Sequence, residues 1–173
     1  VAFFSLTAYG RIAVPMLQEL SSNEVTNIIN HSESKAIFVS RKQLGKLDET
    51  IVEKLNLVID IETFEFIKVK DTSYTCDGRV TIPTPLDTAA IIYTSGTTGN
   101  AKGVMLCHRN FCANILEAWK AYKINKRDIF MSILPIAHTY EMSIGMLYPF
   151  AMGSKVCYLQ KMPTPTVLVT SLK

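Results

Sequence analysis

The sequence lacks several features that would decide its class at once. It contains no run of about 18 apolar residues, so a membrane-spanning helix of ordinary length is not expected. The cysteines, at positions 76, 107, 112 and 157, include no Cys-x-x-Cys pair, which favours reduced thiols in a cytoplasmic protein over a disulfide framework. The first residues have no initiator Met, basic flank or small-residue cleavage pattern, so no secretory signal peptide is predicted.

A strong charge of one sign is also missing. The chain has 18 basic and 15 acidic residues, a net charge of +3, and they are scattered along it rather than gathered into a basic stripe. A nucleic-acid partner is therefore not expected. Cys107, His108 and Cys112 are not followed by a second ligand pair at zinc spacing, so a zinc site is not predicted there. The composition, 48% hydrophobic and 19% charged, is that of an ordinary globular protein.

Apolar residues follow strand and helix periods in alternation. Ser21 and Glu24 have the spacing of a capping box and predict a helix over residues 22–31. Leu44, Leu47, Ile51 and Leu55 predict a second amphipathic helix, and Phe111, Ile115, Trp119 and Tyr122 are expected to form the inner face of a third. A further helix is expected through residues 140–153. The strands are expected in the stretches RIAVPM, KAIFVS, LNLVIDI, TAAIIY, DIFMSILP and SKVCYL.

This order of elements predicts an α/β fold: a doubly wound, mostly parallel sheet with helices on both faces. Residues 62–88 fit less well, because an alternating stretch, FEFIKVK, is followed by the proline-stiffened TIPTPLD. We interpret them as an edge excursion or connector. Both ends of the chain read as cut helices, so residues 1–173 are expected to be one partial domain of a longer protein.

The segment IIYTSGTTGNAKGVMLCHRN, residues 91–110, is the most distinctive in the chain. Its glycines permit backbone angles that turn consecutive N–H groups toward one anion, and Lys102 adds a positive charge. In the predicted fold the segment leaves the carboxyl end of a strand and precedes a helix, where open α/β sheets bind ligands. A solvated turn is the alternative. The spacing fits neither the common phosphate loop nor a dinucleotide fingerprint, because Lys102 follows Ala101 and precedes Gly103.

From Tyr93 to Asn110 the segment resembles the phosphate-binding signature of the adenylate-forming enzymes, which include acyl-CoA synthetases, luciferase-type ligases and peptide-synthetase adenylation domains. Ala101 stands where these enzymes often carry Pro, and Cys107 where Thr or Ser is frequent. A second stretch, LPIAHTYE at residues 134–141, resembles the Leu-Pro-Leu-Ala-His-x-x-Glu element of long-chain fatty acyl-CoA ligases.

The resemblance implies part of the N-terminal AMP-binding region of an AMP-forming long-chain fatty acid–CoA ligase, with a fatty acid, ATP, Mg²⁺ and coenzyme A as reactants. It implies that Lys102 and His138 are catalytic and that Thr94 is a magnesium ligand. His138 and Glu141 would adjoin the acyl pocket. It also implies a cytoplasmic protein with peripheral membrane contact at the inner surface. The phosphate-binding residues would be Thr94, Ser95, Gly96, Thr97, Thr98, Gly99 and Lys102.

Several alternatives stay open on the sequence. The elements that complete the nucleotide site in the family are not found here, so the chain by itself is expected to be inactive. A non-catalytic nucleotide-binding domain, a ligase for a non-fatty carboxylate, and a membrane-surface module built on residues 142–152 are the other hypotheses. The sequence predicts neither acyl chain length nor oligomeric state.

Overall fold

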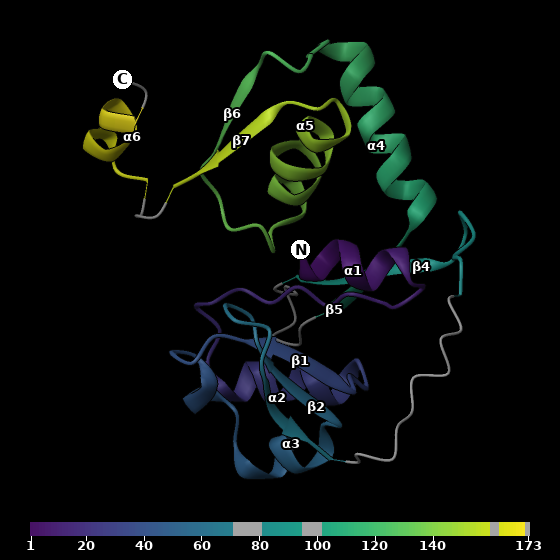
Figure 1. Ribbon diagram of the computed structural model, residues 1–173, viewed down its shortest axis with the longest axis vertical. Helices are drawn as coiled ribbons and strands as arrows, with labels where there is room; N and C mark the ends of the chain where they lie inside the picture. Colours follow the sequence, from purple (N-terminus) through teal and green to yellow (C-terminus); the bar gives the residue numbers. More distant parts are fainter. Residues whose placement is uncertain (71–80, 95–101, 160–162, 172–173) are drawn as a thin grey trace. The chain divides into compact units, whose positions relative to one another are not determined.

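The computed structural model describes residues 1–70, 81–94, 102–159 and 163–171 (Figure 1). The chain divides into two compact units, Val1–Met105 and Leu106–Lys173, and each is described by itself. Within the described residues no helix is both long and apolar enough to cross a membrane.

A three-stranded sheet organises the first unit. Strand β1 (Ala36–Val39) pairs in parallel with β2 (Leu57–Asp60), and β3 (Phe66–Val69) adds to β2 in the antiparallel direction. Helices α2 (Ser22–His31) and α3 (Glu49–Lys54) contribute their apolar residues to the core beside this sheet. That core consists of Val25, Ile29, Ile37, Val39, Ile51, Leu55 and Val58.

The capping box predicted for α2 is confirmed. The Ser21 N–H donates to the Glu24 carboxylate at 2.8 Å, and the Glu24 N–H donates to the Ser21 hydroxyl at 3.4 Å. The helix predicted over residues 44–55 is instead broken into a 3₁₀ turn, Leu44–Lys46, and α3. Asp48 causes the break, because its carboxylate accepts the Ile51 N–H at 2.7 Å and so starts a new helix.

The expected strand at RIAVPM is reduced to a single bridge. Ala13 pairs in parallel with Ala90, donating to Ala89 and accepting from the Ile91 N–H, each at 2.9 Å. It follows α1 (Ala2–Ala8), and Ala90 belongs to β4 (Thr88–Thr94). Strand β4 and β5 (Lys102–Cys107) form a two-stranded sheet. A strand therefore lies between the glycine-rich segment and the helix that we expected to follow it directly.

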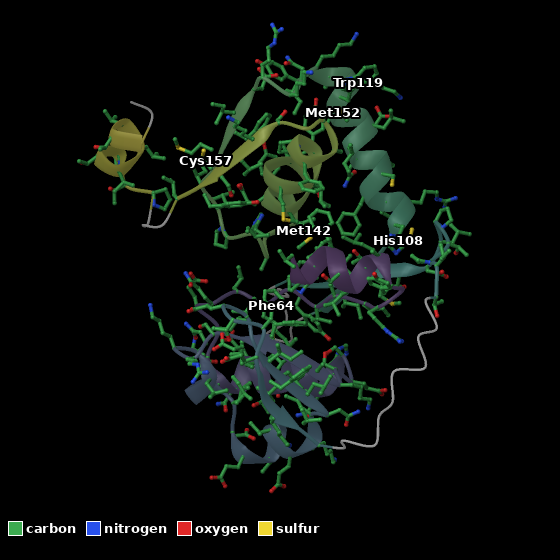
Figure 2. All side chains as sticks on the ribbon, viewed as in Figure 1. Phe64, His108, Trp119, Met142, Met152 and Cys157 are labelled. Atoms are coloured by element: carbon green, nitrogen blue, oxygen red, sulfur yellow. The ribbon has the colours of Figure 1, made fainter. Side chains whose placement is uncertain are left out.

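The second unit is built on a parallel pair of strands. Strand β6 (Ile129–Ser132) pairs with β7 (Lys155–Tyr158), so that Ser132 and Tyr158 are opposite each other at the carboxyl ends. Helix α4 (His108–Ala121), the π-helix η2 (Glu141–Leu147) and the short α5 (Tyr148–Ala151) contact one another, and α6 spans Pro165–Ser171. Met142 of η2, labelled in Figure 2, is almost fully buried.

The inner face predicted for α4 is only partly correct. Phe111 is buried, but Trp119 is 39% exposed and Tyr122 is 76% exposed. Tyr122 leaves the helical face because α4 ends before it and its backbone at the C-cap is extended. Figure 2 shows Trp119 on α4, where Lys123 lies 5.2 Å from its ring centroid. The α/β class itself is confirmed, although the described strands form three separate sheets.

Candidate functional site

Strands β4 and β5 border the segment that the sequence marks as phosphate-binding. Thr94 ends β4, Lys102 begins β5, and both are exposed. No hydrogen bond or ion pair joins the Lys102 ammonium group to another described side chain or carbonyl. Five of the predicted ligands lie outside the described residues: Ser95, Gly96, Thr97, Thr98 and Gly99.

Gly103, next to Lys102, is required by close packing. A Cβ atom at Gly103 would lie 2.9 Å from Cγ2 of Ile91 and 3.2 Å from Cζ of Tyr93. Real side chains almost never approach so closely, so glycine lets β5 pass directly against the β4 side chains. The sequence analysis gave Gly103 a role in turning the backbone, whereas the structure shows a role in bringing the two bordering strands together.

The end of the signature starts a helix. The N–H and the thiol of Cys107 both donate to the Asn110 Oδ1 atom, at 2.9 and 3.0 Å, and α4 begins at His108. Asn110 thereby accepts the backbone N–H of Cys107 at the start of the helix. A Ser or Thr at position 107 would also support the start of a helix there. The closing residues of this signature thus serve helix initiation.

A second group of polar residues gathers in the other unit. Ser132, Glu141 and Ser143 are 3%, 4% and 5% exposed. Ser132 ends β6, where parallel strands present their carboxyl ends, and η2, which carries Glu141 and Ser143, contacts β6. The sequence analysis named Glu141 but missed both serines, since a serine in an apolar stretch carries no distinctive signal.

Two buried oxygens of this group have no hydrogen-bond partner among the described residues. They are Oε1 of Glu141 and Oγ of Ser143. Buried polar atoms are normally hydrogen-bonded, and leaving one unpaired costs roughly 1–3 kcal/mol. Tyr158 adjoins the group: burial raises the pKa of its phenol, and the negative charge of Glu141 raises that pKa further.

Gly145 makes room for the Glu141 carboxyl group. A methyl group at Gly145 would lie 2.6 Å from the Glu141 Cδ atom, which no real contact allows. The carboxyl group therefore folds back along η2 over a residue that has no side chain. This requirement was not visible in the sequence, where Gly145 only interrupts an apolar run.

His138 differs from Glu141 in its surroundings. Its side chain is exposed, and its backbone donates to Pro135 and accepts from the Met142 N–H, both at 2.9 Å. It therefore stands in the turn that leads into η2, while Glu141 lies inside the unit. Thr94 and Lys102 belong to the first unit, and His138 and Glu141 to the second, so each pair is placed within its own unit only.

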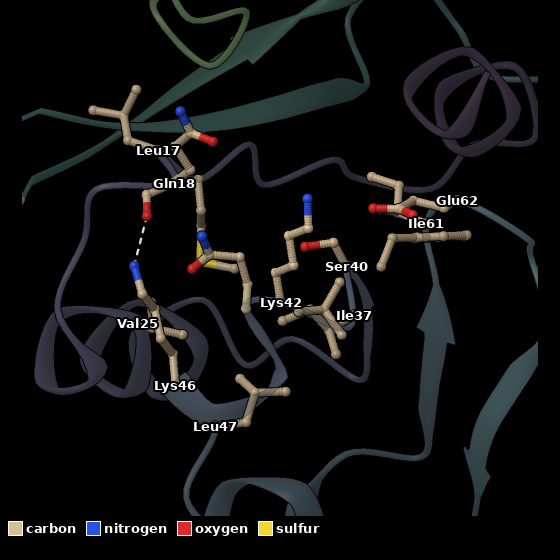
Figure 3. A pocket seen from close by; sticks show the side chains of 14 residues that line it. Leu17, Gln18, Val25, Ile37, Ser40, Lys42, Lys46, Leu47, Ile61 and Glu62 are labelled. Carbon is tan, nitrogen blue, oxygen red and sulfur yellow. Dashed lines mark hydrogen bonds between the residues drawn. The ribbon is translucent and has the colours of Figure 1, made fainter.

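A separate cavity of about 490 Å³ in the first unit is lined by residues of β1 and by residues that follow β1 and β2 in the chain. Met16 and Val25 are among its apolar lining residues, and Lys42, Lys46 and Glu62 are charged (Figure 3). The Lys46 ammonium group donates to the Gln18 and Leu20 carbonyls at 2.5 and 2.7 Å, which fixes one side. None of the predicted site residues lines this cavity.

The chain belongs to a known enzyme family. The family model described as AMP-binding enzyme matches residues 1–173, the whole chain. The chain is therefore a member of the AMP-binding, adenylate-forming enzyme family, as the resemblance in the sequence predicted.

Particular relatives sharpen the comparison. Long chain acyl-CoA synthetase 6, peroxisomal, of Arabidopsis thaliana is 34% identical over 78% of this chain and 22% of its own length. Long-chain-fatty-acid--CoA ligase 1 of Cavia porcellus is 29% identical over 88% of this chain and 25% of its own length. The crystal structure of ATP-bound MatB from Rhodopseudomonas palustris has a TM-score of 0.77 at 18% identity, over 97% of this chain and 34% of that one. The chain thus spans about a quarter of the length of these curated relatives.

Proposed function

We propose that this chain is part of an AMP-forming fatty acid–CoA ligase. In the first step a carboxylate oxygen attacks the α-phosphorus of ATP, and the bond to pyrophosphate breaks to leave an acyl-adenylate. In the second step the thiol of coenzyme A attacks the acyl carbonyl, a thioester forms, and AMP leaves. The observation that carries the proposal is the unbroken signature from Tyr93 to Asn110, combined with relatives named for long-chain acyl-CoA synthesis.

Lys102 is the main electrostatic group in this proposal. Its exposed ammonium group is unpaired among the described residues, and Lys102 is the first residue of β5, the strand next to β4. At about 4 Å and an effective dielectric constant of about 20, one charge pair with a phosphate oxygen is worth roughly 4 kcal/mol before desolvation is subtracted. The charge that develops on departing pyrophosphate is what such a group stabilises.

Magnesium enters this reaction as a companion of ATP. The exposed Thr94 hydroxyl would offer one oxygen ligand. A hydroxyl oxygen suits Mg²⁺, which otherwise keeps several waters and takes phosphate oxygens rather than a complete protein cage. The remaining phosphate contacts are assigned to Ser95, Gly96, Thr97, Thr98 and Gly99.

His138 and Glu141 are assigned to the acyl side of the reaction. The exposed His138 imidazole, in the turn before η2, would position or gate the acyl substrate rather than act as a base. Glu141 adds a buried oxygen without a described partner, which is available to a hydrogen-bond donor. We also propose that residues 1–173 alone are inactive, and that the intact protein is cytoplasmic with peripheral membrane contact.

The test is fatty-acid-dependent exchange of labelled pyrophosphate into ATP by the intact protein. We expect Lys102→Ala to lower the exchange rate by about 100-fold, because it removes charge stabilisation of the leaving group, while the melting temperature is unchanged. Lys155→Ala is the matched control, since Lys155 is also an exposed lysine at the first position of a strand.

Three outcomes would contradict the proposal in different ways. Equal losses of exchange and of melting temperature would make Lys102 structural. Absence of exchange with any carboxylic acid would favour a non-catalytic nucleotide-binding domain. Exchange with short or aromatic acids but not with a series of fatty acids would identify a ligase for another class of carboxylate.

A further inference from the structure

Helix α2 ends in contact with the strand that leads to the phosphate-binding segment. His31 is the last residue of α2, and its Nδ1 atom lies 2.6 Å from the hydroxyl oxygen of Tyr93 on β4. The two rings also meet edge to face, with centroids 5.7 Å apart and an interplanar angle of 82°. A hydrogen bond and a ring contact together fix both the tip and the plane of the tyrosine.

The turn after α2 is held by hydrogen bonds of its own side chains. Ser32 and Ser34 share a hydrogen bond of 2.7 Å between their Oγ atoms, and Glu33 between them has a positive φ of 52°. Burial raises the pKa of the Tyr93 phenol, while a hydrogen bond with Ser32 works in the opposite direction. A phenol keeps its proton at neutral pH, and the tautomer of the imidazole decides which of the two groups donates in the bond between Tyr93 and His31.

Tyr93 contacts both borders of the phosphate-binding segment. It directly precedes Thr94, and its ring lies against Gly103, where an added Cβ atom would be 3.2 Å from Cζ. Gly103 directly follows Lys102. Tyr93 therefore adjoins both described groups that are assigned to the triphosphate: it directly precedes Thr94, and its ring lies beside the residue that follows Lys102.

We propose that His31 is a positioning residue for ATP. Through its Nδ1 atom it holds Tyr93, and Tyr93 in turn holds the backbone at Thr94 and Lys102 at the spacing that the triphosphate requires. His31 itself touches neither reactant. The inference rests on the proposed function, because it assigns a support to the same phosphate site.

The test compares His31→Ala, His31→Asn and His31→Gln in the intact protein, using the pyrophosphate exchange assay and direct titration with MgATP. We expect His31→Ala to raise the KM for MgATP and its dissociation constant by about three- to tenfold, because the phosphate contacts lose their alignment. The KM for the fatty acid should stay within about twofold, since the acyl side makes no use of His31.

The rescue variants separate positioning from mere packing. Asparagine places a polar atom near the position of Nδ1, whereas the amide of glutamine reaches toward the position of Nε2, so His31→Asn should restore ATP binding and His31→Gln should not. Tyr93→Phe should match His31→Ala, and the double variant should lose no more than either single one. Asn30→Ala is the control on the same helix, because Asn30 pairs with Lys54 at 3.0 Å and not with Tyr93.

The inference is overturned if His31→Ala raises both KM values equally, lowers only the melting temperature, or is rescued by glutamine as well as by asparagine. The proposed function fails separately, if the unaltered protein binds MgATP yet exchanges no pyrophosphate with any acid. In that case the MgATP titration still decides the role of His31. An unaltered protein that binds no MgATP overturns both.

Discussion

Asp60 in the first unit and Glu141 in the second are both buried carboxylates, 1% and 4% exposed, but their hydrogen bonding differs. Asp60 accepts from the Arg41 guanidinium at 2.8 Å and from the Glu62 N–H at 2.9 Å. Glu141 has one oxygen without any partner among the described residues. Buried polar atoms are normally hydrogen-bonded, so the two carboxylates differ in whether the described residues meet that requirement.

The residues that surround the two carboxylates also differ in polarity. Asp60 ends a strand beside a closed apolar core, in which Ile51 and Leu55 are fully buried. Glu141 shares its surroundings with Ser132, Ser143 and Tyr158 near the carboxyl ends of two parallel strands. The first unit therefore buries a carboxylate that neighbouring groups satisfy, whereas the second buries polar groups of which two oxygens have no partner among the described residues.

The largest expected effect tests the closed core of the first unit. Leu55→Ala should lower the free energy of unfolding by about 2–5 kcal/mol, because it removes buried apolar atoms and leaves a cavity in their place. Denaturant unfolding of the intact protein, followed by circular dichroism, measures the change. Leu116→Ala, at a position that is 51% exposed on α4, should cost far less. Equal costs at the two positions would mean that the core is not closed as described.

A smaller effect is expected where Glu141 is held. Gly145→Ala should destabilise the protein by about 1–3 kcal/mol, because the new methyl group overlaps the Glu141 carboxyl group. Glu141→Ala removes the overlapping atoms, so the double variant should recover most of that loss and show strong non-additivity. Thermal unfolding of the three variants measures the coupling. Additive losses would show that the carboxyl group does not lie over Gly145.

The smallest effects compare the carboxylates directly. Hydrogen bonds from the Glu62 N–H and from Arg41 lower the pKa of Asp60, so its ionised form stabilises the native state above the unfolded pKa. That stabilisation is lost as the pH falls below about 4 toward the lowered native pKa. The unaltered protein should therefore lose stability in this window, and Asp60→Asn should be less stable at pH 7 and less sensitive to acid.

Replacing Glu141 should change the stability of the protein very little. Glu141→Met removes a buried oxygen that has no described partner and keeps a similar volume, so the free energy of unfolding should change by no more than about 1 kcal/mol. Melting temperatures measured from pH 3 to pH 7 follow both variants. If Glu141→Met costs as much as Asp60→Asn, Glu141 has a structural partner and the contrast between the units is lost.

Local signals in the sequence predicted most of the elements and few of the contacts. Helix α2 was predictable because Ser21 and Glu24 cap it from three residues apart. The break at Asp48 was missed because the apolar spacing runs on through a residue whose carboxylate starts a new helix. Tyr122 was misplaced because periodicity continues past the point where the backbone of α4 ends.

Part of the candidate site could likewise be predicted from the sequence, and part could not. The segment from Thr94 to Gly103 could be singled out as a phosphate-binding candidate because its hydroxyls, glycines and lysine are contiguous, and that role stays a prediction. The burial of Glu141 depends on the side chains that pack over it, and no residue next to it in the sequence indicates that packing. The pairing of His31 with Tyr93 joins residues 62 positions apart, and neither carries a local signal of the other. Their contact required the folded chain.

The turn between β2 and β3 has a further consequence for local opening of the first unit. The Asp60 backbone accepts the Phe64 N–H at 2.8 Å and donates to the Glu65 carbonyl at 2.9 Å, while Arg41 reaches both Asp60 and Glu65. Backbone closure and charge pairing thus depend on the same few atoms. Amide protons of this turn should exchange with solvent together, as one cooperative opening unit. The ion pairs of the Arg41 guanidinium group should set how often that unit opens.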